Sequence, residues 1–122
     1  MTQKEIAIHF LNLVTSGEVK QAYDAYIHPK FRHHNAYFLG DRDTLLKGME
    51  ESAERFPSKL YQPIRALEDG DLVAVHGRLL LNPDGPEFAL VHIFRFQDGS
   101  IIEEWECFQE VPEDSPNENG VF

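Results

Sequence analysis

Positively charged side chains are scarce in this chain, and they never gather into a run. The 122 residues include 11 Lys and Arg against 21 Asp and Glu, which gives a formal net charge of −10. Nucleic-acid backbones and anionic membrane surfaces are bound through clustered basic side chains, so neither is an expected partner. No apolar run approaches the roughly 20 residues that a membrane-spanning helix needs. We therefore expect a soluble protein.

Cysteine is also nearly absent, since Cys107 is the only one. A lone cysteine forms no internal disulfide, and the first residues lack the charged and apolar segments of a secretion signal. The expected location is therefore the cytoplasm. No basic residue neighbours Cys107 in the sequence, which favours a small buried side chain over a nucleophile. Without repeats or low-complexity segments, the sequence predicts a single domain over residues 1–122.

The first half of the chain has the apolar spacing of helices. Thr2 and Glu5 form a capping-box pattern at the start of a helix that Gly17 ends. The later elements are delimited by Pro29, by Asp41 as a helix cap and by Pro57. These are a second helix over 18–26, a short extended segment over 31–35 and a third helix over 41–56.

The second half of the chain is typical of strands and turns. Four strands are expected between Tyr61 and Gln109, separated by loops at 68–70, 82–86 and 97–99. Helices followed by strands indicate an α+β domain, with the N-terminal helices packed on a curved antiparallel sheet of four to five strands. The tail from Val111 is expected to be irregular.

The hairpin register decides which polar side chains face each other. Three-residue hairpins closed by Gly70 and Gly99, with a five-residue central loop, align one residue from each strand. That row consists of Gln62, His76, His92 and Glu104. Two-residue turns are the open alternative for the first and last hairpins, and they reverse the neighbouring strand's faces. Polarity matching favours the three-residue option, because it pairs Phe94 with Ile102.

Both faces of the predicted sheet are apolar. The even-numbered face carries the bulkier side chains around the polar row, and we expect it to enclose a cavity under the helices. The odd-numbered face is flatter, which predicts contact with a second copy of the chain in a homodimer. Its residues are Leu67, Val73, Val75, Leu79, Ala89, Val91, Ile93, Ile101 and Trp105.

Several stretches resemble a known family. They are the His34-Asn35 pair, the segment 93–96, the segment 98–106 and the segment 109–112. Together with the order of elements, they resemble the SnoaL-like, polyketide cyclase-related group of the nuclear transport factor 2-like (cystatin-like) superfamily. The resemblance implies a cone-like half-barrel with a pocket between sheet and helices, usually free of cofactor. It also implies acid/base chemistry on a carbonyl compound, or ligand binding alone.

The chain departs from that family at the polar positions. Relatives usually have His-Trp-Asp where this chain has Glu104-Trp105-Glu106, and they often have Asp where it has His92. The titratable groups remain, but their types are exchanged between strands. The carry-over of one specific reaction is therefore not predicted.

Proton transfer beside a carbonyl needs a base with a pKa near the working pH, a donor for the oxygen and a dry pocket. Glu104 and Glu106 share one strand face, about 7 Å apart. We predict Glu104 or Glu106 as the base, with His92 as its catalytic partner. The expected ligand-binding residues are His34, Asn35, His76 and Phe94.

Other interpretations of these residues stay open. The two carboxylates are also typical of a solvated sheet rim, and His34 is equally typical of a solvated turn. His76, His92 and one glutamate also match a metal set, but we expect no metal or cofactor because the resembled family is mostly metal-free. The predicted function is a cofactor-independent lyase or isomerase for a small carbonyl compound. The alternatives are a non-catalytic small-molecule binding module and a purely structural dimer.

Overall fold

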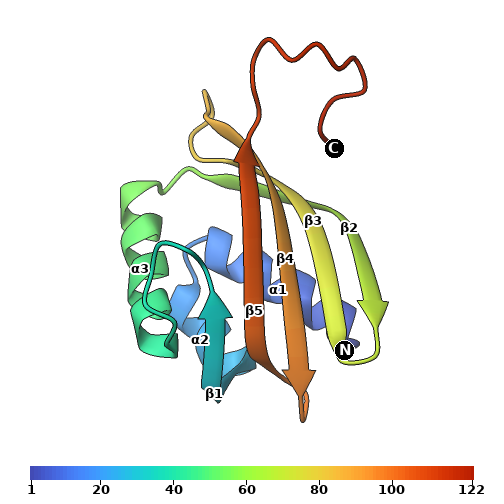
Figure 1. The fold of residues 1–122 in the computed structure, drawn as a ribbon. Helices are drawn as coiled ribbons and strands as arrows, with labels where there is room; N and C mark the ends of the chain where they lie inside the picture. Colours follow the sequence, from blue (N-terminus) through green and yellow to red (C-terminus); the bar gives the residue numbers. More distant parts are fainter.

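The computed structural model describes residues 1–122 and contains three helices and five strands (Figure 1). The predicted α+β class is confirmed, and the tail after Glu110 is irregular as expected. No helix is long and apolar enough to cross a membrane. In chain order the elements are α1 (Gln3–Thr15), α2 (Val19–Tyr26), β1 (Ile27–His34), α3 (Arg42–Arg55), β2 (Leu60–Asp69), β3 (Leu72–Leu80), β4 (Glu87–Gln97) and β5 (Ser100–Glu110).

The helices begin where the sequence predicts. The Thr2 hydroxyl accepts a hydrogen bond from the Glu5 backbone N–H at 3.1 Å, and the Glu5 carboxylate accepts one from the Thr2 backbone. Asp41 caps α3 by accepting from the Thr44 backbone N–H at 2.9 Å. These side chains satisfy backbone donors that a helix start otherwise leaves unpaired.

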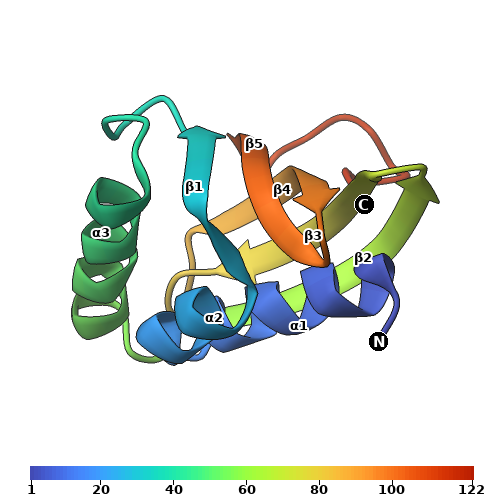
Figure 2. The same ribbon diagram turned by 90° about the horizontal axis from the view of Figure 1, so that it is seen from below.

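The five strands form one sheet in the order β1-β5-β4-β3-β2. Strand β1 runs parallel to β5, and every other neighbouring pair is antiparallel. All three helices lie on one side of the curved sheet (Figure 2), so we call that side the inner face and the opposite side the outer face. The sheet is therefore antiparallel at every pairing except that of its edge strand β1.

The core lies between the helices and the inner face. It contains 15 buried residues, and aromatic rings join its layers. Phe10 of α1 meets Phe94 of β4 edge to face, with ring centroids 5.8 Å apart. Gly77 of β3 leaves room for the Tyr61 ring from β2, because a side chain at Gly77 would overlap that ring. The sheet and helices are thereby locked together around a shared apolar layer.

The β4–β5 hairpin differs from the predicted three-residue loop. It turns through two residues, Asp98 at φ 53° and Gly99 at φ 80°. A β-bulge then leaves Ile102 unpaired between the Arg95–Glu103 and Phe96–Ile101 pairs. One extra residue reverses the side to which the following residues point, so the even residues of β5 return to the inner face.

The predicted pairing across this hairpin is wrong by two residues. His92 lies opposite Glu106 rather than Glu104, and Phe94 lies opposite Glu104 rather than Ile102. The even residues of both strands nevertheless share the inner face. The two-residue turn, combined with the bulge, accounts for both results.

The predicted row also fails at β2 and β3. Gly70 and Asp71 form a two-residue turn that sets Arg65 opposite His76, and Gln62 lies opposite Arg78. The central loop has six residues, 81–86, instead of five, so His92 lies opposite Val75. His76 therefore projects from the outer face, away from His92.

The small size of the odd-numbered residues of β3 explains why they face the helices while His76 faces outward. Val73, Val75 and Gly77 are buried on the inner face beneath the helices. Placing His76 there would bury a polar ring against α1 in their stead. The predicted outer apolar face is corrected accordingly, since Val73, Val75, Leu79 and Ile101 belong to the inner side.

Candidate functional site

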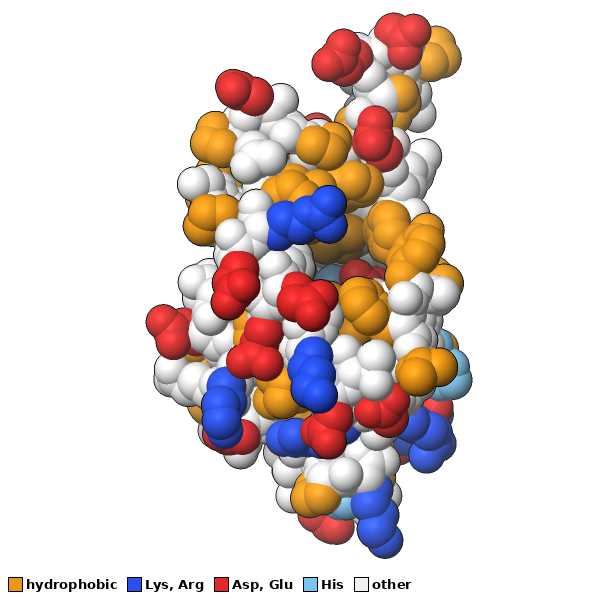
Figure 3. Space-filling model, turned by 90° about the vertical axis from the view of Figure 1, so that its left-hand side faces the viewer, with side chains coloured by type: hydrophobic (Ala, Val, Ile, Leu, Met, Phe, Trp, Pro, Cys, Tyr) orange, Lys and Arg blue, Asp and Glu red, His pale blue; other side chains and the backbone are white.

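A cavity of about 240 Å³ opens between the inner face and the helices. Hydrophobic residues supply 11 of its 17 lining side chains. Figure 3 shows a hollow on the α3 side of the molecule, rimmed by hydrophobic side chains, with histidine and acidic atoms at its floor. The lining includes Phe10, Leu11 and Val14 from α1, Leu45 and Met49 from α3, and Phe88, Leu90 and Phe108 from the sheet.

The polar floor of the cavity comes from β4 and β5. His92 and Glu104 are only 7% and 5% exposed, and Glu106 lies beside them. The His92 Nε2 atom is 3.5 Å from Glu106 Oε1 and 4.0 Å from Glu104 Oε1. The structure thus assembles the three residues that the sequence predicts as catalytic.

Asn35 reaches the same floor from β1's C-terminal end. Its Nδ2 donates to Glu106 Oε2 at 2.7 Å. His33 fixes this position, because its Nδ1 accepts from the Asn35 backbone N–H at 3.1 Å while its Nε2 donates to the Leu39 carbonyl at 2.6 Å. Glu106 is therefore held on both sides, by an amide and an imidazole.

The two carboxyl groups of the floor ionise differently. Burial raises the pKa of Glu104 to about 7, against a lowering effect of His92 and a further raising effect of Glu106. Burial would also raise the pKa of Glu106, but the hydrogen bonds and charge of His92, with Asn35, lower it below its ordinary value. Burial opposes a charge on His92, yet the carboxylates raise its pKa. These directions favour a His92–Glu106 ion pair beside Glu104, the carboxyl that keeps its proton to the higher pH.

The other predicted ligand-binding residues lie elsewhere. His34 stacks on Trp105 of the outer face, with ring centroids 5.1 Å apart. His76 is on the outer face against Phe122 and bonds to Arg65. Phe94 is fully buried behind the floor, where its ring stacks on His92 at 5.9 Å. Of that predicted group, only Asn35 forms a hydrogen bond with the polar floor, and Phe94 packs behind it.

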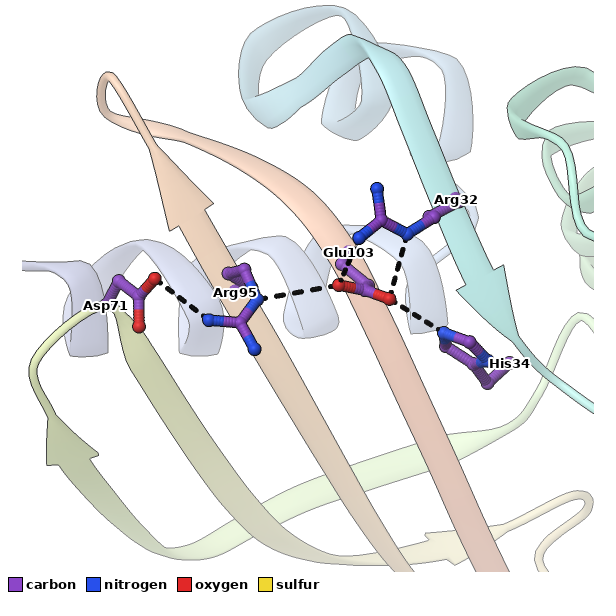
Figure 4. A network of polar contacts seen from close by, with 5 residues as sticks. All are labelled: Arg32, His34, Asp71, Arg95 and Glu103. Atoms are coloured by element: carbon purple, nitrogen blue, oxygen red, sulfur yellow. Dashed lines mark hydrogen bonds and ion pairs between the residues drawn. The ribbon is translucent and has the colours of Figure 1, made fainter.

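On the outer face, a separate ionic network surrounds Glu103 (Figure 4). Arg32 binds this carboxylate through two nitrogens, both at 2.9 Å, and His34 Nε2 donates to it at 2.8 Å. Arg95 lies 3.5 Å from the same group and bonds to Asp71. Burial would raise the pKa of Glu103, but the hydrogen bonds from His34 and Arg32 lower it. Glu103 and His34 belong to this outer network and do not line the cavity.

Two titratable lining residues, Tyr23 and Lys59, were missed from sequence. Tyr23 lies on the buried side of α2, and burial, reinforced by Glu104, raises the pKa of its hydroxyl so that it stays protonated. The sequence did contain a signal for Tyr23, because a tyrosine stands on the buried stripe of a helix where a phenylalanine would pack as well. Lys59 directly precedes β2, in a turn region where no sequence pattern marks it as a lining residue. Its Nζ donates to Ser52 Oγ at 2.7 Å.

The residues present do not form an evident metal centre. The alternative set of His76, His92 and a glutamate is not assembled, because the two histidines project from opposite faces. No group of three or more His, Cys, Asp or Glu side chains has the geometry to hold a metal ion.

Comparison with known proteins places this site in context. A family model described as "SnoaL-like domain" matches residues 7–104. No curated protein matches the chain. Among solved structures, AclR from Streptomyces galilaeus, a proposed hydroxylase, has a TM-score of 0.74 at 18% identity, covering 88% of this chain and 78% of its own.

Two further structures resemble the fold. IdmH from Streptomyces antibioticus, a proposed polyketide cyclase, has a TM-score of 0.69 at 22% identity, covering 88% of this chain and 93% of its own. An uncharacterised cystatin-fold protein from Novosphingobium aromaticivorans has a TM-score of 0.74 at 18% identity, covering 88% and 98%. At these identities the likeness shows the shared fold.

Proposed function

Because the chain belongs to the SnoaL-like domain family, we propose that it binds a small carbonyl compound in this cavity and moves a proton at the carbon beside the carbonyl. The observation that carries the proposal is Glu104, a buried carboxyl with a pKa of about 7 on the floor of an apolar cavity. A base works best when its pKa lies near the operating pH.

The proposed roles follow from how each group is held. Glu106 is occupied by Asn35 and His92, which favours Glu104 as the proton acceptor. Tyr23 lines the same cavity with a neutral hydroxyl, a suitable donor for an oxygen that gains negative charge. The positive charge of His92 favours the ionised form of Glu104, whereas the Glu106 carboxylate opposes it. No resident cofactor is needed for such a step.

The pH dependence of exchange tests this assignment. Ketones that raise the melting temperature are incubated with the protein in deuterium oxide, and exchange at the carbonyl-adjacent carbon is followed by proton NMR. Since only ionised Glu104 accepts a proton, the exchange rate is expected to rise through about pH 7 and then level off. A rate already maximal at pH 5 would assign the base to Glu106 instead, whose pKa is lowered.

A non-catalytic binding module is the second candidate, and the predominance of apolar lining supports it. In that case ligands stabilise the protein, but exchange does not exceed the buffer rate at any pH. The same titration therefore separates the two candidates.

We also propose that the outer face pairs two copies of the chain. Ala89, Val91, Ile93 and Trp105 remain on that face, and Val91 is 38% exposed. Light scattering on a sizing column is expected to give twice the mass of one chain. Val91→Glu should yield monomers, whereas Leu39→Glu, in the exposed loop between β1 and α3, should leave the dimer intact. A monomeric parent protein at micromolar concentration would contradict the pairing.

A further inference from the structure

Lys59 is the only lysine or arginine that lines the cavity. Its ammonium group is half-buried and makes one hydrogen bond, to Ser52 Oγ, although it carries three donors. It forms no ion pair, in a chain that has 21 acidic side chains against 11 basic ones. An ammonium group drawn into an apolar wall without a counter-charge is unfavourable unless a further group pairs with it.

The charged groups of the cavity lie at different depths. Glu104 and His92 are almost fully buried at the floor, whereas Lys59 is half-buried and hence nearer to the opening. Figure 3 shows a basic side chain at the rim of the hollow and acidic atoms within it. A ligand anion is repelled by the carboxylates of the floor and attracted to the ammonium group at the opening.

We propose that the cavity takes amphipathic monocarboxylates, with the carboxylate held at the opening by Lys59 and Ser52. The Ser52 oxygen accepts from Lys59, so its hydroxyl proton is free to donate to the same carboxylate. The apolar body then lies among the leucine and phenylalanine side chains. This inference rests on the proposed binding of a carbonyl compound and narrows it to keto acids whose carbonyl faces Glu104.

Burial lowers the pKa of Lys59. A bound carboxylate is expected to oppose that effect, since an opposite charge favours the ionised amine. Proton uptake on binding would accordingly be small near neutral pH and would grow at alkaline pH. The effect is a secondary readout that merely filling the cavity would not produce.

The test compares octanoate with octanamide by isothermal titration calorimetry at neutral pH. One charge-assisted hydrogen bond corresponds to about tenfold in affinity, so the parent protein should bind octanoate about tenfold more tightly than octanamide. Lys59→Met should remove this preference without weakening octanamide, and Lys59→Arg should retain it. Lys47→Met, an exposed position on α3, removes the same charge and should change nothing.

The outcomes separate this inference from the proposed function. Equal affinity of the parent for acid and amide, or a preference that survives in Lys59→Met, overturns the carboxylate assignment and leaves the ketone exchange untouched. A Lys59-dependent preference without any ketone exchange supports the carboxylate site and rejects the catalytic role. Binding of neither compound overturns the carboxylate site, while ketone exchange then decides the proposed function on its own.

Discussion

Replacing Glu104 by Gln is expected to lower the rate of proton exchange by roughly 10²- to 10⁴-fold, the usual contribution of a positioned general base. The amide fills the same volume but accepts no proton at any pH, so the residual rate should also lose its rise near pH 7. Proton NMR in deuterium oxide measures both. Glu103→Gln is the matched control, because the neighbouring side chain belongs to the outer network and should leave the rate unchanged.

The same substitution should stabilise the fold above pH 7. A carboxyl whose pKa is raised on folding binds more protons in the native state, so wild-type stability falls as pH rises from about 4.5 to about 7. Each unit of pKa difference corresponds to about 1.4 kcal/mol. Gln removes this loss, and urea unfolding at pH 5 and pH 8 measures it. A variant that is less stable than the parent at pH 8 would show that the ionised carboxylate holds the fold together.

Phe94→Ala is expected to destabilise the fold by about 3–5 kcal/mol, because it removes a fully buried ring from the centre of the core. The ring contacts Phe10 of α1 on one side and His92 on the other, so its loss removes an apolar contact between α1 and the sheet. A domain of this size has about 5–15 kcal/mol of stability in total. Urea unfolding followed by circular dichroism measures the change.

Phe108→Ala is the matched control for Phe94. Phe108 lies on the same face of the adjacent strand, yet it is 43% exposed and lines the cavity. Its removal should cost clearly less stability than the loss of Phe94, since less apolar surface leaves the interior. Similar losses at the two positions would mean that the core does not depend on the Phe10–Phe94 contact.

Capping and periodicity were sufficient to predict the helices. The capping side chains of Thr2, Glu5 and Asp41 bond to groups only three residues away, so the sequence shows both partners of each cap. The turn signals at Gly70 and Gly99 also located two hairpins correctly. These features do not depend on how distant parts of the chain pack.

Hairpin register, in contrast, depends on that packing. An Asp-Gly pair permits loops of two or three residues, and no residue type marks Ile102 as a bulge. The face of β3 was decided by the fit of Val73, Val75 and Gly77 beneath the helices, which local alternation does not reveal. Sequence therefore predicted His92, Glu104, Glu106 and Asn35 for one site, but misplaced His34 and His76.

The bulge at Ile102 has a consequence for how such a protein diversifies. With the two-residue turn and the one-residue bulge kept, inserting one residue after Ile102 would bring Glu103 opposite Phe94, so that Glu103 and Trp105 would enter the hollow and Glu104 and Glu106 would turn outward. A single-codon insertion thus exchanges Glu104 and Glu106 for Glu103 in the hollow without any substitution, whereas deleting Ile102 would keep the present pairs. One strand therefore carries two different sets of side chains that can face the hollow, and a single mutational event is enough to change from one set to the other.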